Sequence, residues 1–114
     1  MRYVLLIYTN ETAASQASKQ EQDAVMAAYM AFGEEFKDKI LGGDALLSTS
    51  SATTVQVRAG KTLTNDGPFA ETKEQLGGYY VVNCKDLDEA IQIAARIPDA
   101  ANGSIEVRPV MEFN

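Results

Sequence analysis

The chain has 114 residues, a formal net charge of −6 and no histidine, with 46% hydrophobic and 23% charged residues. This length and composition are typical of a globular protein, and we expect one domain spanning residues 1–114. The acidic charge disfavours nucleic acid and anionic membrane surfaces as partners, because both are negatively charged. The lack of histidine excludes the commonest neutral-pH base and metal ligand, and one cysteine excludes an intramolecular disulfide.

The sequence starts with a strand-like segment. Residues 3–8 form a continuous apolar, β-prone run, which predicts a strand covered on both faces. The run is far shorter than the roughly 20 residues that a membrane span needs, so we expect a cytoplasmic location. Residues 9–17 are small and polar, and we expect a connector there.

A long helix is predicted next. Ser18 and Glu21 have the spacing of a capping box at a helix start. The apolar positions that follow step by three or four residues and predict one helical stripe as far as Leu41: Val25, Tyr29, Phe32, Phe36 and Ile40. Glu35 and Lys39 are placed to form an i,i+4 ion pair, and Gly42-Gly43 predicts the helix stop.

The middle of the chain predicts a hairpin. A short extended piece is expected at Leu46-Leu47, and residues 53–58 alternate like a half-buried strand. Ala59-Gly60 then turns the chain back into residues 61–64. Residues 65–68 are dense in turn-forming side chains, and a loop over residues 69–76 is expected to end at Gly77-Gly78.

The last third predicts a strand, a helix and a strand. Residues 79–84 are a second apolar strand, and Asp86 caps a helix that Pro98 ends near Arg96 or Ile97. The inner face of that helix is expected at Leu87, Ala90, Ile91 and Ala94. The final strand is expected over residues 104–113, with Ile105, Val107, Met111 and Phe113 on one face and Pro109 placing it at a sheet edge.

This order of elements predicts an α+β fold of the ferredoxin-like type. Apart from the hairpin arm at residues 61–65, the order is the β-α-β-β-α-β of a split βαβ, with two helices on one face of an antiparallel sheet. The strands at 3–8 and 79–84 should be central, and those at 53–58 and 104–113 should be edges. Because the central strands are apolar on both faces, we expect a homodimer through the sheet faces, a dimeric α+β barrel. The alternative is a monomer whose loops cover that face.

Two groups of polar residues are candidates for chemistry. The stretch 66–74 offers Asp66 or Glu71 as a base and Lys73 to stabilise a carboxylate or enolate, so these three are the candidate catalytic residues. A ligand in the dimer interior would meet polar side chains of the same stretch and of the strands: Arg58, Thr72, Tyr79, Tyr80, Glu106 and Arg108. Sequence does not decide which of Tyr79 and Tyr80 faces the interior. The alternative is that the loop charges are solvated and that Glu106 and Arg108 pair across strands.

The composition implies neither a metal site nor a cofactor. One cysteine and no histidine exclude thiolate and histidine-rich sites, and no glycine-rich phosphate-binding pattern occurs. Asp66, Glu71 and Glu74 could hold a hard cation, but their spacing matches no known cation loop. Cys84, at the end of an apolar strand, is expected to be an inert core residue.

The run Asp66-Gly67-Pro68-Phe69-Ala70-Glu71-Thr72-Lys73-Glu74 closely resembles the signature of the YCII-related, DGPF-motif family. The segments 3–8, 76–80, 86–90 and 106–110 also resemble that family. The resemblance implies a ferredoxin-like dimeric α+β barrel. It also implies an association with sigma factors, because members are often encoded beside them. The superfamily is thought to use a His-Asp pair, and a few relatives act on phenolic or lactone rings. A chain without histidine lacks that pair, so only the 66–73 motif is carried over.

The leading hypothesis is therefore a homodimer that binds a small organic molecule in an enclosed cleft, with acid–base chemistry of the isomerase or lyase type. The alternative is a non-catalytic ligand-sensing or protein-interaction module that serves a transcriptional regulator.

Overall fold

The computed structural model describes residues 1–113. Six strands, three α-helices and two 3-10 turns follow one another along this part of the chain. They are β1 (Arg2–Thr9), α1 (Glu11–Ser15), α2 (Lys19–Glu35), β2 (Ile40–Ala45), η1 (Thr49–Ser51), β3 (Thr53–Arg58), β4 (Lys61–Asp66), β5 (Gln75–Asn83), α3 (Leu87–Ala95), η2 (Pro98–Ala101) and β6 (Ser104–Pro109).

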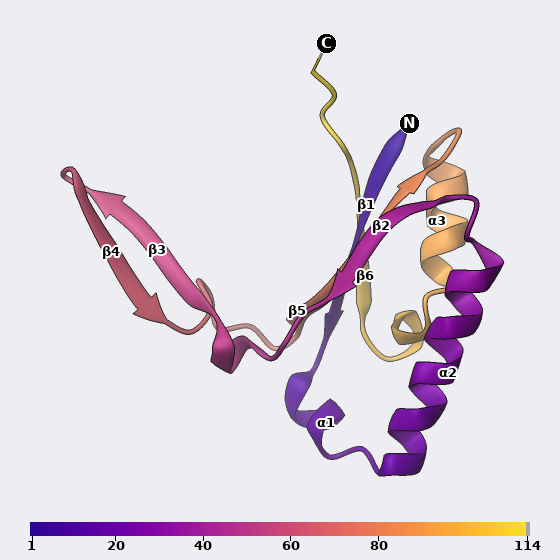
Figure 1. Ribbon diagram of the computed structural model, residues 1–114, viewed down its shortest axis with the longest axis horizontal. Coiled ribbons are helices and arrows are strands. Elements are labelled where there is room, and N and C mark those ends of the chain that lie inside the picture. Colours follow the sequence, from indigo (N-terminus) through magenta and orange to yellow (C-terminus); the bar gives the residue numbers. More distant parts are fainter. Residues whose placement is uncertain (114) are drawn as a thin grey trace.

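The main sheet has four strands in the order β2-β5-β1-β6, and each neighbouring pair is antiparallel. β1 and β5 are central, and α2 and α3 cover one face of the sheet (Figure 1). This arrangement confirms the predicted α+β, ferredoxin-like fold. It also confirms the sequence interpretation of residues 3–8 and 79–84 as central strands.

The core lies between the sheet and the two long helices. On β1, alternate residues point into it, so Tyr3, Leu5 and Ile7 are buried. Val82 comes from β5, Phe32 from α2, and Ala90, Ile93, Ala94 and Ile97 from the segment around α3. Removing such side chains from water is the main free-energy gain that attaches the helices to the sheet.

The second strand of the main sheet is β2, and the prediction of residues 53–58 for this edge was wrong. α2 ends at Glu35, and both Lys39 N and Ile40 N donate to Phe36 O at 2.8 and 2.9 Å, which reverses the chain. Gly42-Gly43 therefore lies inside a strand and does not stop the helix. A glycine pair fits a helix stop and a close backbone approach equally well, and here the close approach applies at Gly43.

The predicted ion pair between Glu35 and Lys39 is also absent, because the helix ends before Lys39. Glu35 instead pairs with Arg96 at 2.9 Å, and Lys39 with Glu89 at 3.4 Å. Both pairs connect the α2 side of the core to the α3 segment. Glu35 and Lys39, which the sequence analysis placed as partners on one helix, therefore each pair with a residue of the α3 segment.

β3 and β4 form a separate two-stranded sheet, which we call the arm. The hairpin itself was predicted correctly, and it turns at Ala59 and Gly60, which both have positive φ. The prediction that residues 53–58 form an edge of the main sheet was wrong, because β3 does not join that sheet. Arg58, which was predicted to meet a ligand in the dimer interior, consequently does not lie on the main sheet.

Several boundaries and faces also differ from expectation. α1, capped by Asn10, forms inside the expected connector, and β5 already starts at Gln75, so Gly77-Gly78 belongs to the strand. β6 ends at Pro109, and Met111 and Phe113 after it are exposed. The expectation of one strand from 104 to 113 was therefore wrong at its C-terminal end.

The inner face of α3 is rotated relative to the prediction. Ala90, Ile93, Ala94 and Ile97 are buried, whereas Leu87 and Ile91 remain 49% and 48% exposed. Both stripes have helical spacing, so periodicity alone does not choose between them. The packing of α3 against β6 and the core decides.

The sheet face opposite the helices is partly exposed and apolar at its centre. Val4, Leu6 and Tyr8 of β1 lie there with Tyr79 and Val81 of β5, as the pairing register requires. We call this surface the open face. Glu106 and Arg108 flank it on β6, where they pair opposite Leu6 and Val4.

The molecule is more extended than its length requires. Its radius of gyration is 16.1 Å, whereas a compact chain of this length has about 13 Å. The arm accounts for the difference, since it projects on the side of the sheet that faces away from α2 and α3 (Figure 1). The open face and the arm thus form the two sides of an L.

Candidate functional site

A cleft of about 290 Å³ opens where β1, β2 and β5 meet α2 and η2. Its polar lining comes from Thr9, Tyr29, Asp44, Tyr79, Tyr80 and Asp99, and its remaining lining from Ile7, Ala45 and three glycines. We call it the tyrosine–aspartate cleft. Its size is that of a site for a molecule with about one ring, at the lower end of the usual range for ligand pockets.

Two tyrosine–carboxylate hydrogen bonds lie near this cleft, on opposite faces of the sheet: Tyr29–Asp99 on the helix side, and Tyr79–Asp44 on the open face. The Tyr29 hydroxyl donates to Asp99 Oδ2 at 2.6 Å, and the Tyr79 hydroxyl donates to Asp44 Oδ2 at 2.8 Å. Burial, and then the Asp99 carboxylate, raises the pKa of Tyr29 far above its ordinary value of 10. The hydrogen bond to Asp44 likewise raises the pKa of Tyr79. Both phenols therefore stay protonated at neutral pH and keep their donor roles.

Glycines shape the floor of the cleft. A Cβ on Gly43 would come within 2.5 Å of Tyr79 O and 2.8 Å of Tyr80 Cδ1. A Cβ on Gly78 would come within 3.0 Å of Asp44 O. The missing side chains let β2 and β5 bring Asp44, Tyr79 and Tyr80 together at this edge of the sheet.

The cleft presents hydrogen-bond acceptors. Its charged lining residues are Asp44 and Asp99, both carboxylates. On the helix side, the Tyr29 proton is already donated to Asp99, so the free valences of that pair are oxygen lone pairs. The Tyr80 and Thr9 hydroxyls in the lining can donate or accept. Such a site favours ligands that carry O–H or N–H donors and repels anions.

The 66–74 motif forms the base of the arm. Gly67 has a φ of +101°, which favours glycine, and its N–H donates to Ala52 O at 2.7 Å. Thr54 Oγ1 donates to Gly67 O at 2.8 Å. These two bonds close the hairpin directly after Asp66, the last residue of β4.

Glu11 and Gln75 fasten this base to the body. The Glu11 carboxylate accepts hydrogen bonds from Thr49 N and Oγ1 at 2.9 and 2.7 Å, and Glu11 N donates to Gln75 Oε1 at 2.9 Å. Gln75 Nε2 in turn donates to Thr72 O. Ser104 Oγ, on β6, donates to Glu74 Oε1 at 2.8 Å. Both connections of the arm are thus bonded to the main sheet or to the start of α1.

A second cavity of about 350 Å³ lies at this base, and we call it the motif pocket. Glu71 and Thr72 line it, together with Thr49, Ser50, Gly67, Pro68, Ala70 and Gln75. Glu71 and Lys73 are exposed side chains. Of the three predicted catalytic residues, Asp66 thus ends β4, while Glu71 and Lys73 lie on the loop that follows, and only Glu71 lines the cavity.

The structure distributes the predicted ligand residues over four places. Thr72 lines the motif pocket, and Tyr79 and Tyr80 line the tyrosine–aspartate cleft. Glu106 and Arg108 lie on β6 beside the open face, and Arg108 Nε is 3.6 Å from Glu106 Oε2 along the same strand. Arg58 lies at the tip of the arm, opposite Lys61. Tyr79 has the parity of the open face, whereas Tyr80 packs on Phe32 on the helix side.

Three residues of the cleft were not identified from the sequence. Tyr29 was interpreted only as part of a helical stripe, and Asp44 and Asp99 were not considered. A tyrosine in an apolar stripe is a usable signal, because a buried hydroxyl usually has a polar partner. The identity of that partner, 70 residues away, could not be derived from sequence spacing.

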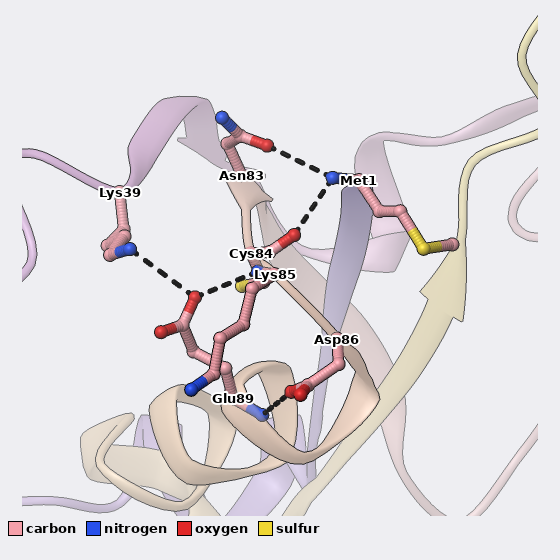
Figure 2. Close-up of polar contacts among 7 residues, drawn as sticks. All are labelled: Met1, Lys39, Asn83, Cys84, Lys85, Asp86 and Glu89. Carbon is pink, nitrogen blue, oxygen red and sulfur yellow. Dashed lines mark hydrogen bonds and ion pairs between the residues drawn. The ribbon is translucent and has the colours of Figure 1, made fainter.

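A polar cluster connects the end of β5 to the start of α3 (Figure 2). The Met1 amino group donates to Cys84 O at 2.8 Å, and Glu89 Oε1 accepts from Lys85 N and Lys39 Nζ at 3.1 and 3.4 Å. Cys84 is buried here, and burial raises the pKa of its thiol. These properties agree with the expectation of an inert cysteine.

The fold of this chain is shared with a solved structure of a known protein. A solved structure with this fold is 5-chloro-2-hydroxyhydroquinone dehydrochlorinase (TftG) from Burkholderia phenoliruptrix AC1100, in complex with 2,5-dihydroxybenzoquinone. It has a TM-score of 0.58 and 16% identity, over 99% of this chain and 96% of that one. No helix within residues 1–113 is long and apolar enough to cross a membrane.

An uncharacterised protein of Rhizobium meliloti (strain 1021) is 40% identical over an alignment of 114 positions, which covers 96% of this chain and 92% of that protein. The family described as YCII-related domain matches residues 1–114. The chain therefore belongs to the YCII-related domain family.

Proposed function

We propose that this protein binds a small, hydroxylated or amine-bearing ring molecule in the tyrosine–aspartate cleft. The observation that carries the proposal is the half-buried Tyr29–Asp99 pair beside Tyr80 in a cavity of about 290 Å³. The Asp99 lone pairs match ligand donors, and the half-buried Tyr80 supplies an apolar ring with one hydroxyl. TftG, which shares the fold, was solved with 2,5-dihydroxybenzoquinone, a single-ring molecule. That complex supports a ligand of this size.

Acid–base chemistry of the isomerase or lyase type is the second part of the proposal. In it Asp66 or Glu71 accepts a proton from a ligand at the motif pocket, which is separate from the tyrosine–aspartate cleft, and Lys73 stabilises the anion that results. These groups are exposed in the single chain, so a partner subunit would have to cover them before desolvation could tune them. Thr72, Arg58, Glu106 and Arg108 are proposed to contact the ligand or the partner around that site.

The protein is further proposed to act as a homodimer through the open face. The apolar centre formed by Val4, Leu6 and Val81 supports this, because a contiguous apolar surface usually marks an interface. The L shape supports it as well, since a second subunit would lie against both sides (Figure 1).

The ligand proposal is tested by thermal unfolding with matched probes. Catechol should raise the unfolding midpoint, whereas 1,2-dimethoxybenzene, which has the same ring without donors, should not. Benzylamine should likewise stabilise more than benzoate. A ligand at about 100 times its Kd adds about 2.7 kcal/mol, which is a shift of about 10 °C for a chain of this length.

Variants locate the binding. Asp99→Asn should raise the apparent Kd for catechol and benzylamine at least about tenfold, as expected on losing a charged hydrogen bond, and should therefore reduce their thermal shifts. Asp23→Asn, on the exposed side of α2, is the control and should bind like the wild type. Equal binding by Asp99→Asn and the wild type would overturn the cleft proposal.

The chemical step has its own test. Asp66→Asn or Glu71→Gln should abolish turnover of a ligand at the motif pocket while leaving the thermal shift with catechol, which reports on the cleft, unchanged. Binding without any turnover in the wild type would instead favour the ligand-sensing alternative and remove the acid–base part.

A further inference from the structure

The arm is a two-stranded ribbon that projects without a layer of its own chain beside it. Val55 and Val57 lie on the same side of β3 and are 59% and 60% exposed. Isolated two-stranded hairpins are marginally stable in water. β-branched apolar residues at alternate positions are typical of a strand face that packs against another surface.

The arm is nevertheless held firmly. Its base is closed by the Gly67–Ala52 and Thr54–Gly67 bonds, and Glu11 and Gln75 connect both of its ends to the body. Ordering this many residues costs conformational entropy. A rigid mount for an exposed apolar ribbon is expected where the ribbon has a packing partner outside its own chain.

Charge indicates what that partner is. Arg58 and Lys61 are paired directly opposite each other at the tip, and like charges in such a pair repel. An anionic surface near the tip would remove this cost. The chain carries a net charge of −6, so a second copy of the chain is an anionic partner overall.

Shape gives the same answer. The arm projects on the open-face side of the sheet, away from α2 and α3 (Figure 1). A second copy seated against the open face would therefore lie within reach of the arm. Because the two surfaces face one side, one partner can cover both.

We propose that the arm is an intersubunit clamp, with Val55 and Val57 packed on a second copy of this chain and Arg58 and Lys61 facing its acidic surface. The inference rests on the proposed homodimer and adds to it a second contact, separate from the open face.

Matched double variants test the clamp by sedimentation equilibrium. Val55→Thr with Val57→Thr keeps β-branched residues in β3 and removes apolar surface. The dimer Kd should rise at least about tenfold, as expected on losing two buried methyl contacts. Leu63→Thr, on the opposite face of the arm, is the control and should leave the Kd unchanged.

A further pair separates this inference from the proposed dimer. Leu6→Thr with Val81→Thr alters the open face in the same chemical manner. If it weakens the dimer while the Val55 and Val57 variant does not, the clamp is overturned and the open-face dimer stands. If the wild type is still a monomer at a concentration of about 100 µM, the clamp and the open-face dimer are both overturned.

Hydrogen exchange on the wild type needs no substitution. Amides of β3 and β4 should become more protected as the protein concentration rises through the dimer Kd, because the partner shields the arm. Protection that is independent of concentration in a chain that does dimerise would contradict the clamp.

Raising the salt concentration should weaken the dimer, and Arg58→Glu with Lys61→Glu should weaken it further.

Discussion

Position 43 shows how one missing side chain shapes the candidate site. A Cβ there would meet Tyr79 O at 2.5 Å, Tyr80 Cδ1 at 2.8 Å and Tyr80 Cα at 3.1 Å. Two of these three atoms belong to the backbone, which cannot rotate away. At Gly42, one residue earlier in the same strand, a Cβ would meet nothing within 4 Å. The two glycines look alike in sequence but differ completely in their surroundings.

Gly43→Ala should therefore lower the free energy of unfolding by about 1–3 kcal/mol, the usual cost of forcing an atom into a packed site. Gly42→Ala should change it by less than about 1 kcal/mol, and in the stabilising direction, because alanine has less backbone entropy to lose. Urea unfolding followed by circular dichroism measures both. Equal effects of the two substitutions would show that β2 does not approach Tyr80 as closely as described.

The junction of β5 and α3 shows how one side chain stabilises an element boundary. Glu89 bonds to Lys85 N, directly before the helix, and to Lys39, directly before β2 (Figure 2). The bond from Lys85 N, and then the Lys39 side chain, lowers the pKa of Glu89 below its ordinary value of 4.5. The ionised carboxylate is therefore the form that holds the junction together.

A carboxyl group with a lowered folded-state pKa stabilises the protein above its unfolded pKa and loses that effect as the pH falls through the folded pKa. Glu89→Gln should thus be less stable than the wild type above about pH 5, and the difference should shrink below about pH 4.5. Urea unfolding across this range measures it, with Asp88→Asn as a neighbouring charge control. A difference that does not vary with pH would mean that Glu89 acts through packing alone.

At the scale of the whole molecule, one chain leaves much of its apolar surface uncovered. The open face, the arm and the C-terminal residues Met111 and Phe113 are all exposed to different degrees. The radius of gyration of 16.1 Å reflects the same property. Exposed apolar area of this extent is unfavourable in water, and association removes it.

The unfolding midpoint should consequently rise with protein concentration, because a dimer is stabilised by mass action. Between about 1 and 100 µM the midpoint should increase by several degrees, as measured by circular dichroism. A midpoint that is constant over this range would argue against the homodimer.

The fold could be predicted further than the site. Continuous apolar runs identified β1 and β5 as central, and the capping residues Ser18 and Asp86 marked the helix starts. The second edge strand was misplaced, because Gly42-Gly43 suits a helix stop as well as a strand. The motif residues Asp66 and Glu71 were visible as a dense polar run. Their position at the base of the arm depends on bonds to Ala52 and Thr49, which no local pattern indicates.

Sequence by itself determined the elements that depend on near neighbours: apolar periodicity, caps and the Ala59-Gly60 hairpin turn. Tertiary structure alone decided that β2 joins the sheet while β3 and β4 leave it, and that Tyr29 meets Asp99 across 70 residues. The physical reason is range. A strand or a helix start is stabilised by residues a few positions apart, whereas a cleft exists only where distant segments pack against each other.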